Sequence, residues 1–527
     1  MIFNSLPFFI FIGIFLPLYF ALKGKARLLL CLIGSYFFYG WWDYRFLSLV
    51  MFSTLIDYVV GLKLEKEDED SKRKRLMLIS MVVNLGFLGF FKYFNFFQES
   101  FISMLNDMGM QAHPSTLKIL LPVGISFYTF QSMSYTIDVY WRKIKVERDF
   151  IRFATFISFF PQLVAGPIVR ASDFLPQFQK DRTFTWDRLI SGTGQMIWGF
   201  FKKVAIADSL APFVDQCFQS PEGFSSLHLL IGIIFYSFQI YCDFSGYSDI
   251  AIGLARVMGF DFPNNFRTPY FSKNFSEFWQ RWHISLSSWL KDYLYIPLGG
   301  SRGGSFGSVF FIVMPLFLLS VFWAESWQTA LIYLSILAAV SFATAVYMRK
   351  SEANKVKGFT YMNNMVTMLL GGLWHGANWA FYFWGFLHGM YLIVQRFLGK
   401  PFGRLMMTLR FPKFLQQGTD ILIVYFFTCL AWVFFRAPDF DIASAYIHGI
   451  ASLENFTPGS IVNKFWALKG FILIGMLLLV EISDFKLNYS QLIQKSPAFR
   501  VASFVILLWI IAFFGSFGAN SFIYFQF

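Results

Sequence analysis

The chain has 527 residues, of which 56% are hydrophobic and 14% are charged, with a net charge of +13. Soluble domains carry about 25% charged residues, so this composition excludes an ordinary soluble domain. Apolar runs of about 17 to 25 residues recur along the whole length, and each can cross a hydrocarbon core of roughly 30 Å. Because the runs are continuous rather than alternating, they indicate helices and not a transmembrane barrel. We therefore predict an all-α, polytopic transmembrane protein with about 11–14 membrane segments.

The positive charge does not indicate nucleic-acid binding. Lys and Arg lie in short loops between the apolar runs, where such residues set membrane topology. No basic stripe is interleaved with aromatic residues that could stack on bases. The four cysteines are scattered and form no CxxC pair, so we expect neither a disulfide framework nor a metal site. Membrane lipids, and no nucleic acid, are the expected surroundings of this chain.

The N-terminal part reads as a series of membrane crossings. Met1 to Leu22 is expected to be the first membrane helix, because it lacks the basic start and the cleavage site of a secretory signal. The runs Leu28 to Trp42 and Phe46 to Leu62 predict a hairpin with a very short turn. Residues 63–75 are rich in Lys and Arg, and the positive-inside rule assigns them to the cytoplasm.

The next part of the chain departs from simple crossings. Leu76 to Phe97 and Leu117 to Tyr140 are expected to span, but Phe153 to Val169 contains Pro161 and Pro167 and has basic residues on both sides. Non-helical backbone is tolerated at membrane depth only where protein or a cavity covers it. We therefore predict a re-entrant segment that dips in from the cytoplasm.

Polar residues mark two further irregular segments. The run Leu227 to Met258 is unusually polar between Asp243 and Asp249, which predicts an interruption of this membrane helix. The two aspartates could form a proton relay or serve packing. Pro263 to Gly304 is amphipathic and rich in Trp and Tyr, as expected of an interfacial or re-entrant segment. No soluble domain or repeat is recognisable, so residues 1–527 are expected to form a single membrane domain. Further spans are expected at Trp198–Val214, Val309–Ala324, Gln328–Tyr347, Ile421–Phe435, Phe465–Ile482 and Val501–Phe517.

One histidine lies next to an apolar run, in the stretch Gly371 to Trp379, which contains Trp374, His375 and Asn378. A polar group at membrane depth costs several kcal/mol unless it is paired or faces water. If this stretch is helical, Asn378 and Trp379 share the face of His375 and could orient its imidazole. The alternative is a buried histidine whose hydrogen bonds are satisfied by a neighbouring helix.

A second histidine, His283, follows Trp282 and lies 92 residues before His375. Trp279, Gln280 and Ser287 are its neighbours at helical spacing, and the alternative is an interfacial belt of Trp and basic residues. We expect the two imidazoles to line one polar passage, with Trp282, Ser287, Trp374 and Asn378 contributing to substrate binding.

The other histidines are expected to be structural. His388 lies thirteen residues after His375, which at 100° per residue turns it about 220° away on a common helix. It is therefore expected to pack between helices, with a supporting role at the site as the alternative. His113 and His448 fall in predicted loops, and His228 begins a predicted helix.

One chemistry that the two histidines could serve is acyl transfer from a thioester to a hydroxyl group. This reaction needs a base that removes the hydroxyl proton. An imidazole with a pKa near 6.5 is suited to that role. No Gly-x-Ser-x-Gly elbow is present, so a serine acyl-enzyme of the hydrolase type is not supported. In a proton-coupled transporter the same histidines would serve as coupling sites, but the inverted repeats that many transporters carry are not recognisable. A scaffold for an acylation complex is a third possibility.

The histidine motifs Trp282–Ser287 and Trp374–Gly376 resemble those of the membrane-bound O-acyltransferase family, and within it the alginate O-acetylation branch. Together, the matching stretches cover nearly the full length of the chain. The supporting stretches are Pro122–Gln131, Phe160–Pro167, Tyr241–Asp249, Trp432–Arg436 and Phe522–Phe527.

The resemblance implies a fold with re-entrant segments around a central funnel or tunnel. It implies that His375 matches the catalytic histidine of the family and His283 the second histidine of the tunnel. No permanently bound cofactor is implied; acetyl-CoA or another acyl thioester would be the donor substrate, entering from the cytoplasm. The acyl group would pass to an extracytoplasmic SGNH-type acyltransferase or another partner that modifies a polysaccharide.

We therefore expect a multi-pass protein of the bacterial cytoplasmic (inner) membrane that acts as an O-acyltransferase. It would move an acyl group, foremost acetyl, from a cytoplasmic thioester toward a hydroxyl of a cell-envelope polymer or exopolysaccharide. The D-alanyl-transfer branch of the family, which uses a carrier-protein thioester, is the alternative, and the stretch Trp432–Arg436 favours the alginate type. These motifs do not determine the acceptor polysaccharide, the acyl chain, the kind of thioester or the oligomeric state.

Overall fold

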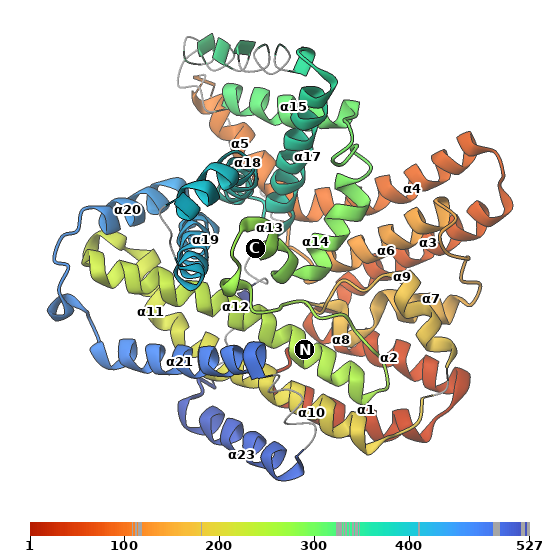
Figure 1. The fold of residues 1–527 in the computed structure, drawn as a ribbon. Coiled ribbons are helices and arrows are strands. Elements are labelled where there is room, and N and C mark those ends of the chain that lie inside the picture. The colour runs from red at the N-terminus through yellow and green to blue at the C-terminus, as the bar shows by residue number, and fades with distance from the viewer. Residues whose placement is uncertain are drawn as a thin grey trace. The chain divides into compact units, whose positions relative to one another are not determined.

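The computed structural model of this chain contains helices and, among the residues that it describes, no strands (Figure 1). The described residues are all except 108, 111–112, 114–118, 181, 409–411, 488–495, 518–521, 524–527 and most of those between 323 and 347. The predicted all-α class is confirmed. The helices form two compact units, the first comprising Met1–Leu88, Pro122–Thr268 and Phe440–Phe527, and the second Gly89–Leu121 and Pro269–Asp439. The single membrane domain over residues 1–527 stays a prediction.

Each unit gathers helices from distant parts of the chain. The first unit contains α1 (Leu6–Ala21), α2 (Gly24–Asp43), η1 (Tyr44–Phe46), α3 (Leu47–Lys66), α4 (Asp70–Leu88), α6 (Ile125–Tyr140), α7 (Phe150–Ser158), α8 (Phe160–Leu163), α9 (Ala171–Phe174), η3 (Leu175–Gln179), α10 (Trp186–Phe200), η4 (Phe201–Ala207), α11 (Asp208–Gln219), η5 (Pro221–Gly223), α12 (Ser226–Val257), α20 (Phe440–Ala451), η8 (Pro458–Ser460), α21 (Lys464–Leu487) and α23 (Pro497–Phe514). The second unit contains η2 (Gly89–Tyr93), α5 (Phe94–Asp107), η6 (Pro269–Phe271), α13 (Phe275–Arg281), α14 (Ile284–Leu290), η7 (Lys291–Tyr295), α15 (Phe306–Phe322), α17 (Glu352–His375), α18 (Trp379–Thr408) and α19 (Lys413–Arg436).

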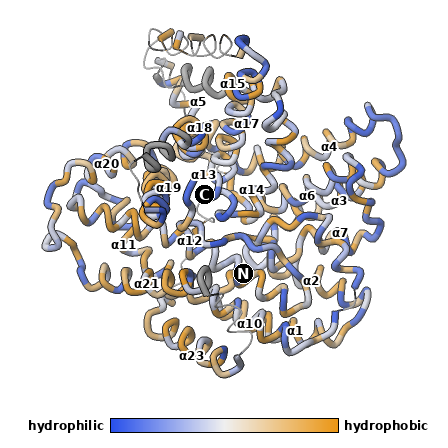
Figure 2. The backbone as a smooth tube through the Cα atoms, in the orientation of Figure 1, coloured by the Kyte–Doolittle hydropathy of each residue, from blue (hydrophilic) through white to orange (hydrophobic). Residues whose placement is uncertain are grey.

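Several helices are suited to a lipid environment. In the described part of the chain, six helical segments are long and apolar enough to cross a membrane. The most exposed of them is α23, of which only 6% is buried and which is hydrophobic along its length (Figure 2). An exposed apolar helix of this kind is stable where lipid covers it. The chain is therefore a polytopic membrane protein, while the total of 11–14 segments stays a prediction and the expected span Gln328–Tyr347 lies mostly outside the described residues. The six segments are Gly24–Lys66, Asp70–Asn106, Ser226–Val257, Lys413–Arg436, Lys464–Ser483 and Pro497–Phe514.

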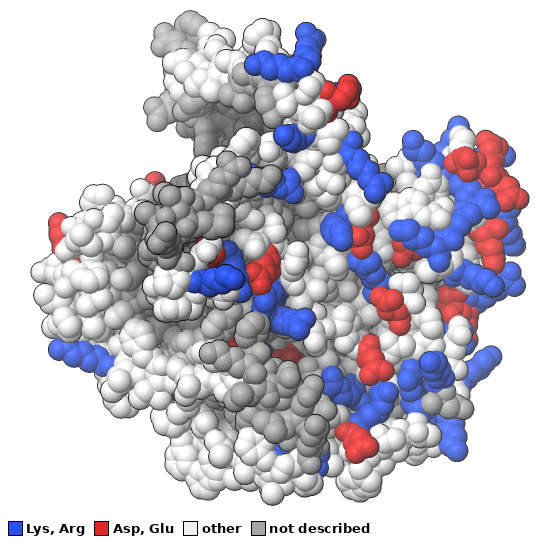
Figure 3. All heavy atoms as spheres, in the orientation of Figure 1, with Lys and Arg blue, Asp and Glu red and all other residues white. Residues whose placement is uncertain are grey.

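Charged side chains are unevenly distributed over the first unit. Lys and Arg gather around the ends of α3 and α4 and beside α7, whereas the surface over α23 is largely uncharged (Figure 3). The first of these regions contains the basic stretch 63–75, which the sequence assigns to the cytoplasm. The distribution separates a basic end of this unit from an apolar flank.

The proline-broken segment of the first unit is buried. Helix α7 ends at Ser158, a short α8 begins at Phe160 with Pro161 in its first turn, and residues 153–169 are all buried. Proline suits a first helical turn because its missing N–H would have no partner there. The predicted break is confirmed, and its re-entrant position in a membrane stays a prediction.

The predicted interruption of the polar span is wrong, because α12 is one continuous helix from Ser226 to Val257. Its carboxylates are neutralised by lysines of the π-helix η4: Lys203 Nζ lies 2.6 Å from Asp243 and 2.8 Å from Asp208, and Lys202 pairs with Asp249. A paired carboxylate does not require the backbone to unwind toward water. These ion pairs agree with a packing role for the two aspartates, and the proton relay stays a prediction.

Two glycines let α17 and α18 of the second unit approach closely. A methyl group at Gly385 would lie 2.3 Å from the carbonyl oxygen of Met368, and one at Gly372 would lie 2.3 Å from that of Phe381. Any larger side chain would push the backbones apart. The close contact fixes the end of α17, where His375 lies.

We expect Gly385→Ala to lower the stability of the protein by about 1–3 kcal/mol, because the added methyl group overpacks the contact between α17 and α18. The matched control is Gly399→Ala on the same helix, where a methyl group would meet nothing within 4 Å. Thermal unfolding of the detergent-purified variants measures the difference. Equal midpoints for the two variants would contradict the close packing.

Candidate active site

The end of α17 determines where His375 lies. The helix stops at His375 because Gly376 continues in an extended conformation, with φ −160° and ψ 153°. Asn378 then caps α18: its Oδ1 accepts a hydrogen bond of 2.9 Å from the main-chain N–H of Ala380, and its Nδ2 donates one of 2.8 Å to the carbonyl of Pro438. The helical break sets the His375 imidazole at the end of one helix and next to the start of another.

Two side chains of η2 hold this helix end. Lys92 Nζ donates hydrogen bonds of 2.6 and 3.0 Å to the carbonyl oxygens of Trp374 and His375, and the Tyr93 hydroxyl donates one of 2.6 Å to the carbonyl of Leu373. The last carbonyls of a helix lack partners within the helix and carry partial negative charge. Lys92 therefore satisfies these carbonyls and fixes the backbone that carries His375.

His283 lies at a sharp change of direction between α13 and α14. Its backbone is left-handed, with φ 43° and ψ 55°, which is uncommon for a residue other than glycine. The Ser287 hydroxyl donates a hydrogen bond of 3.2 Å to the carbonyl of Trp282 and so ties the turn together. Such a backbone conformation persists only where its surroundings impose it, and it is concentrated at functional sites.

The structure brings the two predicted histidines together in the second unit. Their ring centroids are 6.2 Å apart, and the side chains are 0% exposed for His283 and 2% for His375. The Trp374 ring contacts both, with centroid distances of 5.6 Å to His283 and 5.0 Å to His375. The predicted proximity of His283 and His375 is therefore present within one unit.

A third imidazole belongs to the same cluster. Trp384 contacts both His375 and His388, with ring centroids 5.1 and 4.7 Å apart, and His388 also packs against Trp279 at 5.0 Å. The expected orientation of His388 away from His375 is wrong, because the chain leaves the helix between His375 and Trp379 and the two histidines belong to different helices. His388 is fully buried among aromatic rings.

The predicted substrate-binding residues occupy different positions around this cluster. Trp374 contacts both imidazoles, whereas Trp282 stacks on Phe278 at 5.7 Å and contacts Trp432 at 5.0 Å. Ser287 and Asn378 make the backbone contacts described above. Substrate binding by these four residues stays a prediction.

The remaining three histidines lie elsewhere in the sequence and the fold. His448 was expected in a loop but lies on α20, where the helix continues to Ala451. His228 stacks between the rings of Phe213 and Phe224, with centroid distances of 4.3 and 4.5 Å. His113 is exposed and outside any helix. We assign none of the three to the candidate site.

Burial determines the charge state of the His283 imidazole. His283 lies outside the six apolar spans, and burial lowers the pKa of its imidazole to about 3, so the ring is neutral near pH 7. A neutral imidazole has a free lone pair that can accept a hydrogen bond from a hydroxyl group, while the lowered pKa makes His283 a weaker base than a free imidazole. Among the described residues, no group of three or more His, Cys, Asp and Glu side chains could hold a metal ion.

Lys92 belongs to no motif of the sequence, although its position does indicate a functional role. Lys92 is the one charged residue in the predicted span Leu76–Phe97. A charge inside an apolar segment faces a protein partner or water and marks a functional position. Its partners, the carbonyls of Trp374 and His375, are more than 280 residues away in sequence, so no local pattern could identify them.

Comparison with known proteins identifies relatives of this chain by sequence. The profile of the membrane-bound O-acyltransferase family matches residues 142–325. The chain is 40% identical to the probable alginate O-acetylase AlgI of Pseudomonas putida over 84% of this chain and 79% of that protein. It is 33% identical to the peptidoglycan O-acetyltransferase of Helicobacter pylori over 86% of this chain and 80% of that protein. A teichoic acid D-alanyltransferase of Streptococcus thermophilus is 26% identical over 57% of this chain and 63% of that protein.

These relatives span most of the chain, and the identity of 40% extends over 448 residues that include both histidine motifs. The helical membrane fold agrees with the family. The chain belongs to the membrane-bound O-acyltransferase family and is an O-acyltransferase.

Proposed function

We propose that this protein transfers an acetyl group from a cytoplasmic thioester, most simply acetyl-CoA, toward a hydroxyl of an exopolysaccharide or cell-envelope polymer. The observation that carries the proposal is the buried pair of His283 and His375, 6.2 Å apart between ring centroids. The relatives named for acetylation of alginate and peptidoglycan support acetyl as the transferred group. An alginate-type polysaccharide is the proposed acceptor.

In the proposed mechanism, His375 acts as the general base. Its imidazole takes the proton of the acceptor hydroxyl while the oxygen attacks the thioester carbonyl. The carbon–sulfur bond then breaks, and the proton passes from the imidazolium to the departing thiolate. His283 assists by positioning His375 or the acceptor, and the surrounding aromatic rings exclude bulk water, which would otherwise compete with the acceptor hydroxyl.

The location and partners follow from the direction of transfer. A thioester donor is made in the cytoplasm and the polymer lies outside, so we place the protein in the bacterial cytoplasmic membrane. An extracytoplasmic SGNH-type acyltransferase, or another enzyme that modifies the polymer, is the proposed partner. D-alanyl transfer from a carrier-protein thioester is the second candidate, which the matches to teichoic acid D-alanyltransferases favour over a transporter.

We expect His375→Ala to reduce transfer of labelled acetyl from acetyl-CoA to polymer by about 10²–10⁴-fold, because the variant lacks the base. Membrane vesicles that contain the protein and its partners serve for the assay. His448→Ala replaces an exposed histidine of α20 and should retain activity, which makes it the matched control. Full transfer by a folded His375→Ala variant would refute the assignment. Uptake of the labelled compound in unchanged form would instead favour the transporter.

We expect Lys92→Met to lower kcat about tenfold, because the carbonyls at the end of α17 lose their cationic donor and His375 loses its fixed position. Lys92→Arg should restore most of the activity, since a guanidinium can donate to the same carbonyls. Initial rates at varied acetyl-CoA separate kcat from KM, and thermal unfolding monitors folding. An unchanged kcat in the Met variant would show that the helix end needs no support from Lys92.

A further inference from the structure

A cavity in the first unit is lined by basic side chains far in sequence from the histidine motifs. Its volume is 220 Å³, and it lies between the start of α2, the start of α7, the segment that follows η3, and Phe260. One carboxylate lines it, against five cations. The charged lining residues are Lys25, Arg27, Asp149, Arg152, Lys180 and Arg182.

Main-chain carbonyls, and not carboxylates, hold the two central guanidinium groups. Arg27 Nη1 donates a hydrogen bond of 2.5 Å to the carbonyl of Arg182, and Arg27 Nε donates one of 2.7 Å to the carbonyl of Leu22. Arg182 Nη2 donates to the carbonyl of Gln177. A neutral carbonyl orients a guanidinium without cancelling its charge, so the cavity keeps the positive charge of both groups.

Aromatic rings orient these two arginines as well. Arg27 lies over the ring of Tyr19 at 5.0 Å, and Arg182 lies over the ring of Phe260 at 4.9 Å. Such cation–π contacts hold a guanidinium in place and leave its edge available to a further partner. Burial also lowers the pKa of Arg182 from its ordinary value, as expected for a cation that is incompletely solvated.

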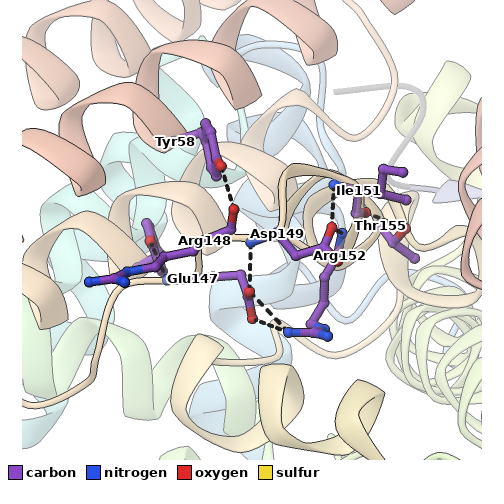
Figure 4. Close-up of polar contacts among 8 residues, drawn as sticks. Tyr58, Glu147, Arg148, Asp149, Ile151, Arg152 and Thr155 are labelled. Carbon is purple, nitrogen blue, oxygen red and sulfur yellow. Dashed lines mark hydrogen bonds and ion pairs between the residues drawn. The ribbon is translucent and has the colours of Figure 1, made fainter. Parts of the chain in front are cut away.

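The nearby carboxylates have other partners (Figure 4). Asp149 accepts hydrogen bonds from the main-chain N–H groups of Ile151 and Arg152 and caps α7. Glu147 accepts two hydrogen bonds from Arg152 Nη1, of 3.0 and 3.1 Å, which neutralise that cation.

Lys25 and Lys180 lie at the rim of the cavity and are exposed. Neither forms an ion pair with a carboxylate of the described residues, and Asp181 is not among these residues. After the pairing of Arg152 with Glu147, four cations and the carboxylate of Asp149 remain among the described charged residues that line the cavity, so the positive charge stays in excess. A cavity with an excess of cationic side chains attracts an anion with several acceptor oxygens.

We propose that this cavity binds a phosphate group. A phosphate ester offers several oxygens to the fork of a guanidinium and to lysine ammonium groups at the same time. The cavity lies beside basic loops that the positive-inside rule assigns to the cytoplasm. Two sources of phosphate meet that face: the phosphorylated end of a thioester donor such as coenzyme A, and the headgroup of an anionic phospholipid. Phosphate binding here does not depend on the acyl-transfer chemistry.

The test uses the full-length protein in nanodiscs of phosphatidylcholine, with adenosine 3′,5′-bisphosphate as the soluble probe and phosphatidylglycerol as the lipid probe. Calorimetry measures binding of the bisphosphate, and native mass spectrometry measures retained phosphatidylglycerol. The double variant Lys25→Gln/Lys180→Gln should weaken binding of one probe about 30-fold, as two lysine contacts imply. Lys25→Arg/Lys180→Arg should restore it.

The matched control is Lys66→Gln/Lys74→Gln, which removes two exposed lysines, one at the end of α3 and one near the start of α4, and should bind as the wild type does. Loss of bisphosphate binding assigns the site to a soluble donor, and loss of phosphatidylglycerol assigns it to lipid. Equal binding by the Gln variant and the control, or binding of neither probe by the wild type, would overturn the proposal. His375→Ala should bind each probe as the wild type does, so a failure of the proposed acyl-transfer chemistry remains distinguishable from a failure of phosphate binding.

Discussion

The end of a buried helix exposes carbonyl groups that no further turn can satisfy, and α17 ends where water has little access. Lys92 and Tyr93 supply the missing donors, and their side chains reach the carbonyls of Leu373, Trp374 and His375. This contact links a charge inside an apolar helix to the position of an imidazole. Each of the two features would be unfavourable alone, because a half-buried ammonium and the carbonyls of a helix end both need partners.

The same constraint explains the polar interior of the first unit. Lys203 lies between Asp208 and Asp243, and Asp243 also accepts a hydrogen bond of 2.8 Å from the main-chain N–H of Ile523. The charges on α12 and η4 are therefore mutually compensated. In the basic cavity around Arg27 and Arg182, by contrast, main-chain carbonyls orient the cations and leave their charge in place. This difference separates an ion-pair network that serves packing from a surface suited to an anionic ligand.

Much of the fold was predictable because the membrane requires long apolar helices. The helices α2 and α3 follow from two apolar runs separated by three residues, and the break between α7 and α8 follows from Pro161. The continuous α12 was not predictable. A polar stretch can be tolerated by unwinding or by pairing with charges elsewhere, and only the packing of η4 against α12 decides between them.

The same distinction between local sequence and tertiary packing applies to the candidate site. The sequence by itself determined that this is a helical membrane protein and that His283 and His375 are chemically suited to a site. These properties depend only on residue type and on the local order of residues. The meeting of the two rings, the inclusion of His388 and the support from Lys92 were decided only by the tertiary structure. Each depends on where a helix ends and which distant segment packs against that end. Such contacts join residues far apart in the chain and leave no periodic trace along it.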